Sequence, residues 1–286
     1  RPVDPGKPPA PLRRLVEAEK GRTAGKVRAF LRAAFAMALR AESDPAAPSA
    51  MLAFDLDANP VADTAALPQF NNTRDRYLSE SELRALWAHL EATNTPSAIT
   101  IRLSLLLGGQ RFNQLLRAQL ADFDEESRTL TLHDSKGKRK LPRVHSLPLS
   151  DEAHALLSER AKVAKGIDSE WLFPAANGTH ATTNTVSKYL QGVRATMIES
   201  KQARDFELAD VRRTCETLLA SLGVSKDIRA QVQSHGLGGV QARHYDRYQY
   251  LPEKKAALDA WARWLTHKPA DNVVPMSKRR SRAKAA

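Results

Sequence analysis

The sequence LLGGQRFNQLLRAQLADFD, residues 106–124, decides how the rest of the chain is interpreted. It overlaps an apolar segment, residues 99–107, whose composition favours a helix. Gly108 and Gly109 end that segment, because glycine adopts backbone angles that a helix excludes. The helical pattern then resumes beyond the two glycines. Arg111 is therefore predicted to lie directly after a glycine corner.

A β-hairpin is predicted immediately after this stretch. Residues 129–132 read Thr-Leu-Thr-Leu, and residues 144–149 form a second run of strand-forming residues. Alternation of polar and apolar residues is typical of a strand that buries one face. The polar segment from Asp134 to Arg139 joins the two runs as a loop. The hairpin predicts a small antiparallel sheet.

Helices are predicted on both sides of the hairpin. Ser79 and Glu82 have the spacing of a capping box, so that a helix begins at or close to Ser79. Further helices are predicted to begin near Ser150, Thr185, Asp210, Ser225 and Pro252. The last of them carries apolar residues at Ala257, Leu258, Trp261 and Leu265. The expected fold class is therefore mainly α with a small antiparallel β-sheet, an α+β arrangement.

The amino-terminal part is predicted to form a small helical domain. Thr23 is placed to cap a helix whose apolar residues, from Val27 to Leu39, recur at steps of three and four. Asp44 and the proline that follows it end this helix. Residues 59–76 then form a connector without clear periodicity, which is where a domain boundary is expected.

These patterns divide the chain into three expected parts. Residues 1–70 form the small helical domain, residues 71–266 form a larger domain, and residues 267–286 form a basic tail. The chain starts with a proline-rich segment, and position 1 is Arg rather than Met. This start leaves open that the chain is a fragment of a longer protein, with its first domain truncated at the amino end.

The charge balance favours a polyanionic partner. The chain has 44 Lys and Arg against 32 Asp and Glu, which gives a net charge of +12 and a pI near 9.9. Six basic residues against one Asp give the tail a net charge of +5, which leaves +7 for the other residues. The expected folded part is therefore basic in its own right.

Cysteine and hydropathy patterns exclude several other classes of protein. The single cysteine, Cys215, cannot form an internal disulfide, and it lies on the apolar face of the helix predicted near Asp210. No cluster of Cys and His has zinc-ligand spacing, so neither a metal nor another cofactor is expected. No apolar run reaches the length of about 18 residues that a membrane span needs. We therefore expect a soluble intracellular protein without a membrane partner.

Three segments, in this order, resemble the active-site blocks of the tyrosine recombinases, the phage integrase family. The first is the opening stretch, with its LLGGQR and ADFD ends. The second is ADVRRT, residues 209–214, with LLASLGV at residues 218–224. The third is Ser234-His235 followed by HYDRY, residues 244–248. The resemblance extends over roughly residues 77–265, and the joint order of the blocks makes it specific. It implies a recombinase-like catalytic domain after a small helical domain.

The resemblance implies DNA cleavage without a metal. In this family a tyrosine oxygen attacks a DNA phosphodiester, a 3′-phosphotyrosine forms and a 5′-hydroxyl leaves. Arg111 and Arg212 match the two arginines that clamp the phosphate, a role that suits forked and permanently charged guanidinium groups. Arg213 is the alternative to Arg212, but the helical turn from Val211 points it in a different direction.

The remaining catalytic roles also come from the resemblance. Lys136, on the hairpin, matches the proton donor to the leaving oxygen, with Lys138 as a close alternative. His235 matches the histidine that contacts the phosphate or assists proton transfer. Tyr245 matches the nucleophile and follows His235 by ten residues, one more than is usual, a difference that the glycines at 236–239 accommodate. The alternative nucleophiles are Tyr248 and Tyr250.

Two departures from the family pattern bear on activity. Ala209 stands where the family commonly has histidine, and its methyl group forms no hydrogen bonds. Gln114 replaces a common acidic residue, and it can hold an arginine by hydrogen bonds but carries no charge. These departures support a second hypothesis, a DNA-binding protein on the same scaffold with weak or lost cleavage. A type IB topoisomerase is a third reading, less favoured because the residues around His235 and Tyr245 resemble those of integrases.

The leading hypothesis is a site-specific recombinase that integrates a mobile genetic element. The resemblance implies double-stranded DNA as the partner, gripped by both domains, and a tetramer of the protein on paired sites. Exchange of the carboxyl-terminal segment between protomers is one arrangement that it allows. Accessory DNA-bending or directionality proteins are further expected partners, and the expected location is the nucleoid of a prokaryotic cytoplasm.

Overall fold

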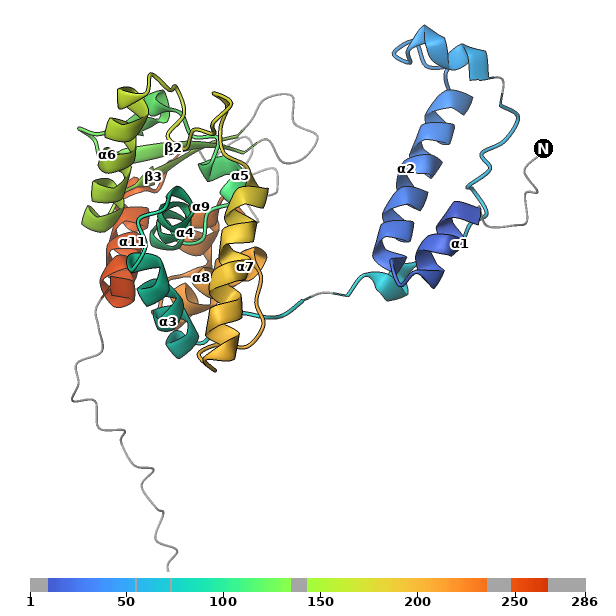
Figure 1. Ribbon diagram of the computed structural model, residues 1–286. Coiled ribbons are helices and arrows are strands. Elements are labelled where there is room, and N and C mark those ends of the chain that lie inside the picture. The colour runs from blue at the N-terminus through green and yellow to red at the C-terminus, as the bar shows by residue number, and fades with distance from the viewer. Residues whose placement is uncertain (1–9, 55, 73, 135–142, 236–247, 267–286) are drawn as a thin grey trace, which may run out of the picture. The chain divides into compact units, whose positions relative to one another are not determined.

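The computed structural model describes residues 10–54, 56–72, 74–134, 143–235 and 248–266 (Figure 1). The chain divides into two compact units, residues 1–75 and residues 76–286, called unit 1 and unit 2 below. Over the described residues, no helix combines the length and the hydrophobicity that crossing a bilayer requires.

Unit 1 consists of short and long helical elements: α1 (Ala10–Glu17), α2 (Gly21–Leu39), η1 (Ser49–Phe54) and η2 (Pro68–Phe70). The sequence did not predict α1, whose second residue is Pro11, although proline fits the first turn of a helix. The prediction that Thr23 caps α2 is wrong, because the helix begins two residues earlier and Thr23 lies within it. The expected helix itself is confirmed.

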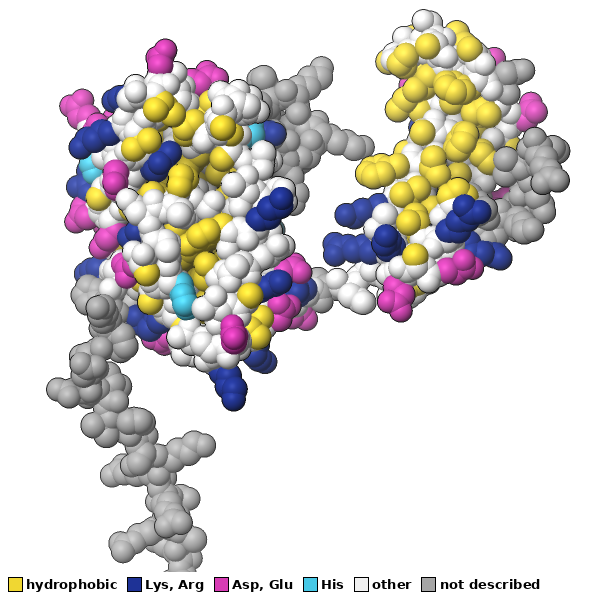
Figure 2. All heavy atoms as spheres, in the orientation of Figure 1, with side chains coloured by type: hydrophobic (Ala, Val, Ile, Leu, Met, Phe, Trp, Pro, Cys, Tyr) yellow, Lys and Arg dark blue, Asp and Glu magenta, His cyan; other side chains and the backbone are white. Residues whose placement is uncertain are grey.

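The surface of unit 1 retains large apolar side chains, visible as yellow along its length in Figure 2. Phe30 on α2 is 74% exposed, and Leu52 and Phe54 on η1 are also exposed. By comparison, few apolar residues of the described part of unit 1 are buried, among them Leu12 and Val61. The core of unit 1 is therefore small.

Unit 2 is a mainly helical body in which the predicted helix starts are largely confirmed. Its helices are α3 (Glu80–Glu91), α4 (Pro96–Leu106), α5 (Phe112–Leu115), α6 (Asp151–Gly166), α7 (Thr183–Glu199), α8 (Leu208–Ser221), α9 (Lys226–Gln233) and α11 (Leu251–Thr266). Ser79 and Glu82 form the predicted capping box, with Ser79 Oγ accepting from the Glu82 N–H at 3.2 Å and Glu82 Oε2 from the Ser79 N–H at 2.7 Å. Ser150 and Ser225 cap α6 and α9 as predicted.

Asp210 does not cap α8, although it fits the cap of the helix predicted to begin near it. The helix begins at Leu208, and Asp210 lies in its first turn rather than ahead of it. The Asp210 carboxylate instead accepts a hydrogen bond from the Glu207 N–H at 2.8 Å. Aspartate stabilises a helix start in either position, so the residue type alone did not fix the first residue of the helix.

A three-stranded antiparallel sheet in the order β1-β2-β3 lies beside the helices. The predicted hairpin is confirmed as β2 (Thr129–Asp134) and β3 (Arg143–Pro148), with Leu132 opposite His145. The strand β1 (Phe123–Asp124) was not predicted, because two residues carry no alternation. With the helices, this sheet confirms the expected fold class.

The core of unit 2 is built around α4, which contacts α3, α5, α6, α7, α8 and α11 (Figure 1). Trp261 of α11 is fully buried and donates from Nε1 to the Leu105 carbonyl of α4 at 2.7 Å. The predicted apolar positions of α11 are confirmed as buried, and so is the expectation that Cys215 is a core thiol. Burial raises the pKa of the Cys215 thiol to about 12.

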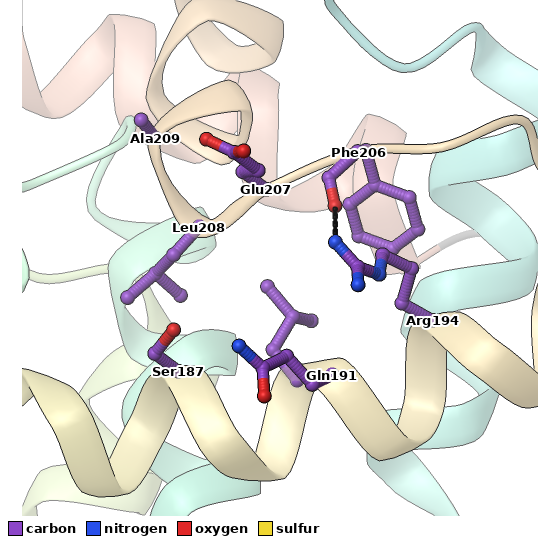
Figure 3. A pocket seen from close by; sticks show the side chains of 8 residues that line it. Ser187, Gln191, Arg194, Phe206, Glu207, Leu208 and Ala209 are labelled. Atoms are coloured by element: carbon purple, nitrogen blue, oxygen red, sulfur yellow. Dashed lines mark hydrogen bonds between the residues drawn. The ribbon is translucent and has the colours of Figure 1, made fainter. Parts of the chain in front are cut away.

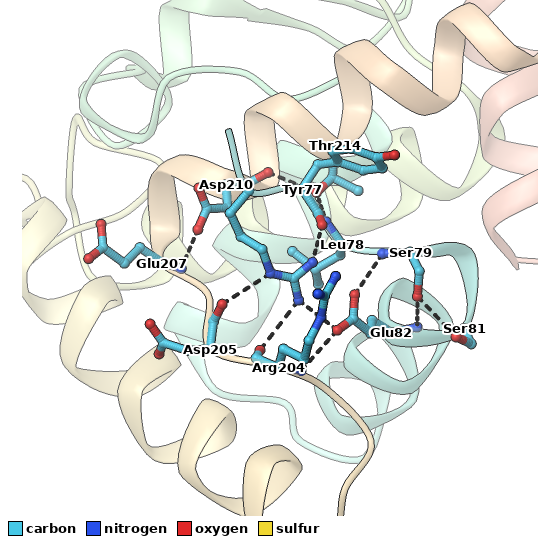
Figure 4. A network of polar contacts seen from close by, with 11 residues as sticks. Tyr77, Leu78, Ser79, Ser81, Glu82, Arg204, Asp205, Glu207, Asp210 and Thr214 are labelled. Carbon is cyan, nitrogen blue, oxygen red and sulfur yellow. Dashed lines mark hydrogen bonds and ion pairs between the residues drawn. The ribbon is translucent and has the colours of Figure 1, made fainter. Parts of the chain in front are cut away.

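A polar network fastens the start of unit 2 to the segment that leads into α8 (Figure 4). Glu82 accepts from Arg76 Nη2 at 2.6 Å and from the Arg204 N–H at 2.9 Å. Nearby, the Leu78 N–H donates to Thr214 Oγ1 of α8 at 2.9 Å. Burial raises the pKa of Glu82, but its hydrogen bonds from Arg76, Arg204 and Ser79 outweigh burial and lower the pKa to about 2. The first residues of unit 2 therefore help to fix α8.

Candidate functional site

The glycine corner brings the start of α5 against α8. Gly109 has a φ of +83°, in the left-handed region that disfavours other residues. A Cβ atom at Gly109 would lie 2.9 Å from Cys215 Cβ and 3.0 Å from Arg212 Cα. The close approach of the two backbones therefore depends on the glycine. It places Arg111, two residues further on, next to the helix that carries Arg212.

Arg111 occupies the position just before α5 and points toward the end of β2. Its Nη1 donates to Asp134 Oδ2 at 3.1 Å. The Asp134 side chain is 7% exposed and the Arg111 side chain 22% exposed, so the ion pair is mostly shielded from solvent. The pair fixes the direction of the guanidinium group while part of that group stays accessible.

Arg212 is held by two backbone carbonyl groups. Its Nη1 donates to the Gly109 carbonyl at 2.8 Å, and its Nη2 donates to the Gln233 carbonyl at 2.7 Å. Burial, and then the positive charge of Arg111, lower the pKa of Arg212 to about 10. The guanidinium therefore keeps its charge at neutral pH. Because Arg212 bonds to Gly109, two residues before Arg111, the two arginines belong to the same glycine corner.

Arg213 takes a different direction from Arg212. Its Nη1 forms an ion pair with Asp210, one turn earlier on α8. Asp210 is fully buried, whereas the Arg213 side chain is 40% exposed. Of these adjacent arginines, Arg212 thus binds backbone carbonyls and Arg213 binds a carboxylate.

His235 follows directly on the segment that holds Arg212. Gln233 donates from Nε2 to the Gly108 carbonyl at 3.0 Å, which ties the end of α9 to the glycine corner. Ser234 then adopts the left-handed conformation, with φ of +49°, and the His235 N–H bonds to the Ala230 carbonyl at 3.0 Å. The His235 side chain is exposed. The structure thus brings Arg111, Arg212 and the backbone leading to His235 into one region.

The other predicted site residues, Lys136 and Tyr245, lie outside the described residues, as does Lys138. The alternative nucleophiles Tyr248 and Tyr250 are described, and their rings meet edge to face with centroids 4.8 Å apart. The Tyr248 hydroxyl donates to Glu253 Oε2 at 3.3 Å. Partial burial, and then the charge of Glu253, raise the pKa of Tyr248, which disfavours ionisation of its hydroxyl.

The interpretation of Gln114 as a partner for an arginine is wrong. Gln114 is buried on α5, and its Oε1 has no hydrogen-bond partner in the part of the chain that the structure describes. Arg111 pairs instead with Asp134, which the sequence assigned to the loop of the hairpin. Sequence reasoning missed Asp134 because the pairing joins residues that are 23 positions apart. Spacing along a single helix cannot reveal such a contact.

A pocket of about 270 Å³ lies between α7 and the start of α8 (Figure 3). Ser187, Gln191 and Arg194 line it from α7, and residues 206–209 line it from the other side. Arg194 Nη1 donates to the Phe206 carbonyl at 3.2 Å, which closes one end. Ala209 is exposed at this pocket, three residues before Arg212. Its methyl group leaves room for a larger side chain.

No group of three or more His, Cys, Asp or Glu within the described ranges has the arrangement of a metal site. The charged groups beside the glycine corner are the guanidinium groups of Arg111 and Arg212 and the carboxylate of Asp134, which bonds to Arg111. The remaining N–H donors of the two guanidinium groups suit an anion with several oxygen atoms.

Known proteins resemble this chain in sequence and in fold. A sequence model of the phage integrase family matches residues 76–250. The integrase of Shigella phage Sf6 is 24% identical over 160 residues, which cover 55% of this chain and 39% of that protein. The match thus spans well under half of that relative.

Solved structures share the fold. A dimer of lambda integrase residues 75–356 bound to a COC′ core site has a TM-score of 0.55 at 17% identity, covering 83% of this chain and 79% of that one. The Tn1549 transposon integrase, residues 82–397, in complex with circular intermediate DNA has a TM-score of 0.54 at 17% identity, covering 86% and 81%.

Proposed function

The chain belongs to the phage integrase family, and from this membership we propose that it cleaves and rejoins DNA at specific sites through a covalent 3′-phosphotyrosine. In this proposal Arg111 and Arg212 hold the scissile phosphate and Tyr245 attacks it. Lys136 gives a proton to the leaving oxygen, and His235 contacts the phosphate or assists proton transfer.

The observation that carries the proposal is the placement of Arg111 and Arg212 at the same glycine corner. Arg212 donates to the Gly109 carbonyl at 2.8 Å, and Arg111 follows Gly109 by two residues. The positive charge of Arg111 contributes, after burial, to the lowered pKa of Arg212. A guanidinium has five N–H donors, and the two bonds of Arg212 to backbone carbonyls leave others for a ligand. A phosphodiester offers two non-bridging oxygens with negative charge, which would offset the positive charges and accept these hydrogen bonds.

The proposed reaction conserves the energy of the phosphodiester bond. The Tyr245 hydroxyl gives up its proton, which His235 or water can accept, and its oxygen forms a bond to phosphorus. The bond from phosphorus to the 5′-oxygen breaks at the same time, and Lys136 supplies the proton that the 5′-oxygen takes up. Attack by a 5′-hydroxyl on the phosphotyrosine reverses these steps and rejoins a strand. Negative charge grows on the non-bridging oxygens in the transition state, so the two arginines accelerate both directions.

The contacts of Tyr248 and the resemblance to the family favour Tyr245 over Tyr248 as the nucleophile. The hydroxyl of Tyr248 bonds to the Glu253 carboxylate, and its pKa is raised. Both effects disfavour the ionised oxygen that attacks phosphorus. The resemblance to the family also aligns Tyr245, and not Tyr248, with the nucleophile.

We further propose that the chain binds duplex DNA with both units and assembles on it as a tetramer. Residues 1–70 would form a DNA-binding helical domain, and residues 71–266 the catalytic domain. The basic residues 267–286 would act as an arm attracted to DNA. Structural relatives include a lambda integrase tetramer bound to a Holliday junction. Accessory proteins that bend DNA or set the direction of recombination would be further partners.

The second candidate is binding without cleavage, favoured by the side chain of Ala209, which cannot form a hydrogen bond. A nicked suicide substrate separates the two candidates, built from a duplex that the protein itself selects from random sequences. Cleavage would trap a covalent adduct that persists in detergent. Tyr245→Phe should abolish the adduct and retain binding, whereas Tyr248→Phe should retain both. Absence of an adduct on the selected duplex would favour binding alone.

A further inference from the structure

A buried histidine contacts the segment that holds Arg212. His145 is on β3 and is 5% exposed. Its Nε2 donates to the Val232 carbonyl of α9 at 2.8 Å, because a carbonyl can only accept. Burial, and then the positive charges of Lys254, Arg143 and Arg212, lower the pKa of His145 to about 3. The imidazole is therefore neutral at working pH and carries its hydrogen on Nε2.

The Val232 carbonyl receives a second hydrogen bond from the other side. Gln110, which directly precedes Arg111, is fully buried and donates from Nε2 to Val232 at 2.8 Å. The same nitrogen donates to the Leu107 carbonyl at 2.6 Å, so both of its hydrogens are used. One carbonyl group thus joins the sheet to the glycine corner.

The next residue continues this connection to Arg212. Gln233 accepts from Arg212 through its carbonyl and donates to the Gly108 carbonyl through its side chain. We call the set of Gln110, His145, Arg212, Val232 and Gln233 the Val232 node. It joins a strand, the glycine corner and two helices. Val232 itself precedes His235 by three residues.

The end of α9 explains why such a node is needed. The last carbonyl groups of a helix have no partner within the helix, and burying them without a partner destabilises the folded protein. At α9 these groups include those of Val232 and Gln233, and the chain turns away at Ser234 through a left-handed residue. The groups that donate hydrogen bonds to these carbonyls therefore set the orientation of the turn. The turn in turn sets the start of the segment that bears His235.

Core packing alone does not account for a histidine at position 145. A leucine would fill a similar space on the inward face of β3, where Leu147 already lies, without burying polar nitrogen atoms. The imidazole differs from leucine by its donor to Val232. Its cationic neighbours also disfavour protonation, which would add a further positive charge behind the arginines.

We propose that His145 is a positioning residue for the DNA-cleaving site: its hydrogen bond to the Val232 carbonyl holds the segment Val232–His235 in place relative to Arg212. This inference rests on the proposed function, because the site that it positions is the proposed one. His145 itself does not contact the phosphate. It acts through the backbone that supports Arg212 and precedes His235.

The cleavage test compares His145→Leu, which removes the donor, with His145→Gln, whose amide nitrogen has a similar reach and can donate. Single-turnover cleavage of the suicide substrate should slow about tenfold or more in His145→Leu, with the Kd for DNA changed by less than about threefold. His145→Gln should recover most of the rate. His154→Leu is the matched control, since His154 Nε2 also lies within hydrogen-bond distance of a backbone carbonyl, that of Glu125 at 3.3 Å. It should cleave like the wild type.

A second measurement does not depend on cleavage. The amide hydrogens of Ser234 and His235 bond to the Ala230 carbonyl, so their exchange with solvent reports on the order of this segment. Exchange at both amides should be about tenfold faster in His145→Leu than in the wild type, and it should slow again in His145→Gln. Amides of α6 should exchange alike in all three proteins.

The outcomes separate the two ideas. Failure of the wild type to form any adduct would remove the proposed function, yet the exchange data would still test whether His145 orders this segment. Normal cleavage and normal exchange in His145→Leu would overturn the positioning role and leave the proposed function intact. A His145→Gln protein as slow as His145→Leu would assign the effect to packing, and would also overturn the role.

Discussion

Arg212 donates a hydrogen bond of 2.8 Å to the carbonyl of Gly109, so the glycine corner that precedes the first arginine also holds the second. The two residues are 103 positions apart in the chain. Their contact makes the geometry of the corner a property of the whole site and not of one loop.

Replacing Gly109 with alanine should destabilise unit 2 strongly. The left-handed φ costs about 1–2 kcal/mol for a residue with Cβ, and the new methyl group would meet Cys215 Cβ at 2.9 Å and the Arg212 backbone at 3.0 Å. Together we expect a loss of about 2–4 kcal/mol in the free energy of unfolding, measured by denaturant titration. Gly223→Ala is the control, because Gly223 has φ of +80° but, its chain neighbours aside, no atom of the described residues within 4 Å of its Cβ position. Equal losses in the two variants would contradict the close approach.

Arg212 and Arg213 should differ sharply when each is changed to alanine. Arg212→Ala should lower the rate of adduct formation by about 100-fold or more, because it removes a charge that stabilises the transition state. Arg213→Ala removes the ion-pair partner of the buried Asp210, which keeps its bond from the Glu207 N–H, so it should lower the unfolding free energy by about 1–3 kcal/mol. Its cleavage rate below the unfolding temperature should stay near that of the wild type. The opposite pattern would exchange the roles of the two arginines.

Asp134→Asn tests the ion pair that orients Arg111. The amide keeps the size of the carboxylate but loses its charge, so the guanidinium should be less well fixed. We expect single-turnover cleavage to slow about tenfold, with DNA binding as tight as before or tighter, because a negative charge has left the site. Asp122→Asn is the matched control, since Asp122 pairs with the neighbouring His133 at 2.9 Å. Faster cleavage by Asp134→Asn would show that the pair is not needed.

Ala209→His tests whether the departure from the family pattern limits the chemistry. Ala209 is exposed beside the pocket at the start of α8, so an imidazole can be accommodated without displacing the core. A second donor near the phosphate should raise the rate of adduct formation several-fold, roughly threefold to tenfold. Ala209→Leu, which fills similar space without a donor, should not. A histidine variant no faster than the leucine variant would place the rate limit elsewhere.

Glu82 should make unit 2 sensitive to acid. Its pKa is about 2 in the folded protein, below the ordinary value of 4.5, so the folded state binds fewer protons than the unfolded state. The stabilisation is therefore complete above about pH 5 and is lost as the pH falls toward 2. Glu82→Gln should be less stable than the wild type at pH 7, and the difference should shrink by pH 3. Measuring the free energy of unfolding of both proteins across this pH range checks the prediction. A difference that stays constant would contradict the lowered pKa of Glu82.

Much of the fold was predictable because its signals are local. The capping box of Ser79 and Glu82 and the alternation of residues 129–132 require only neighbours in the chain. Where two local solutions are equally good, prediction erred: Asp210 can stand before a helix or in its first turn, and Thr23 fits a cap or a helix interior. The short β1 and the proline-led α1 carry too few residues for periodicity.

The candidate site was less accessible to sequence reasoning. Arg111 and Arg212 were chosen by resemblance, and their proximity depends on Gly109, whose backbone angles no side-chain pattern encodes. The partners Asp134 and His145 escaped notice because their contacts cross between strand, corner and helix. His145 did leave one signal, since it alternates with Leu147 on the inward face of β3, where a titratable residue is unusual. The roles given to Lys136 and Tyr245 stay predictions.

The docking of α11 has a consequence for how protomers could assemble. Trp261, Leu258 and Leu265 are buried in the core of their own protomer, and Trp261 is bonded to α4. Withdrawing three such side chains into water costs on the order of 6 kcal/mol. An assembly formed by swapping α11 would thus have to begin from opened protomers, so that its rate would be limited by their small population and would rise under conditions that loosen the core. Association through the outer surfaces would need no such opening and would proceed between closed protomers.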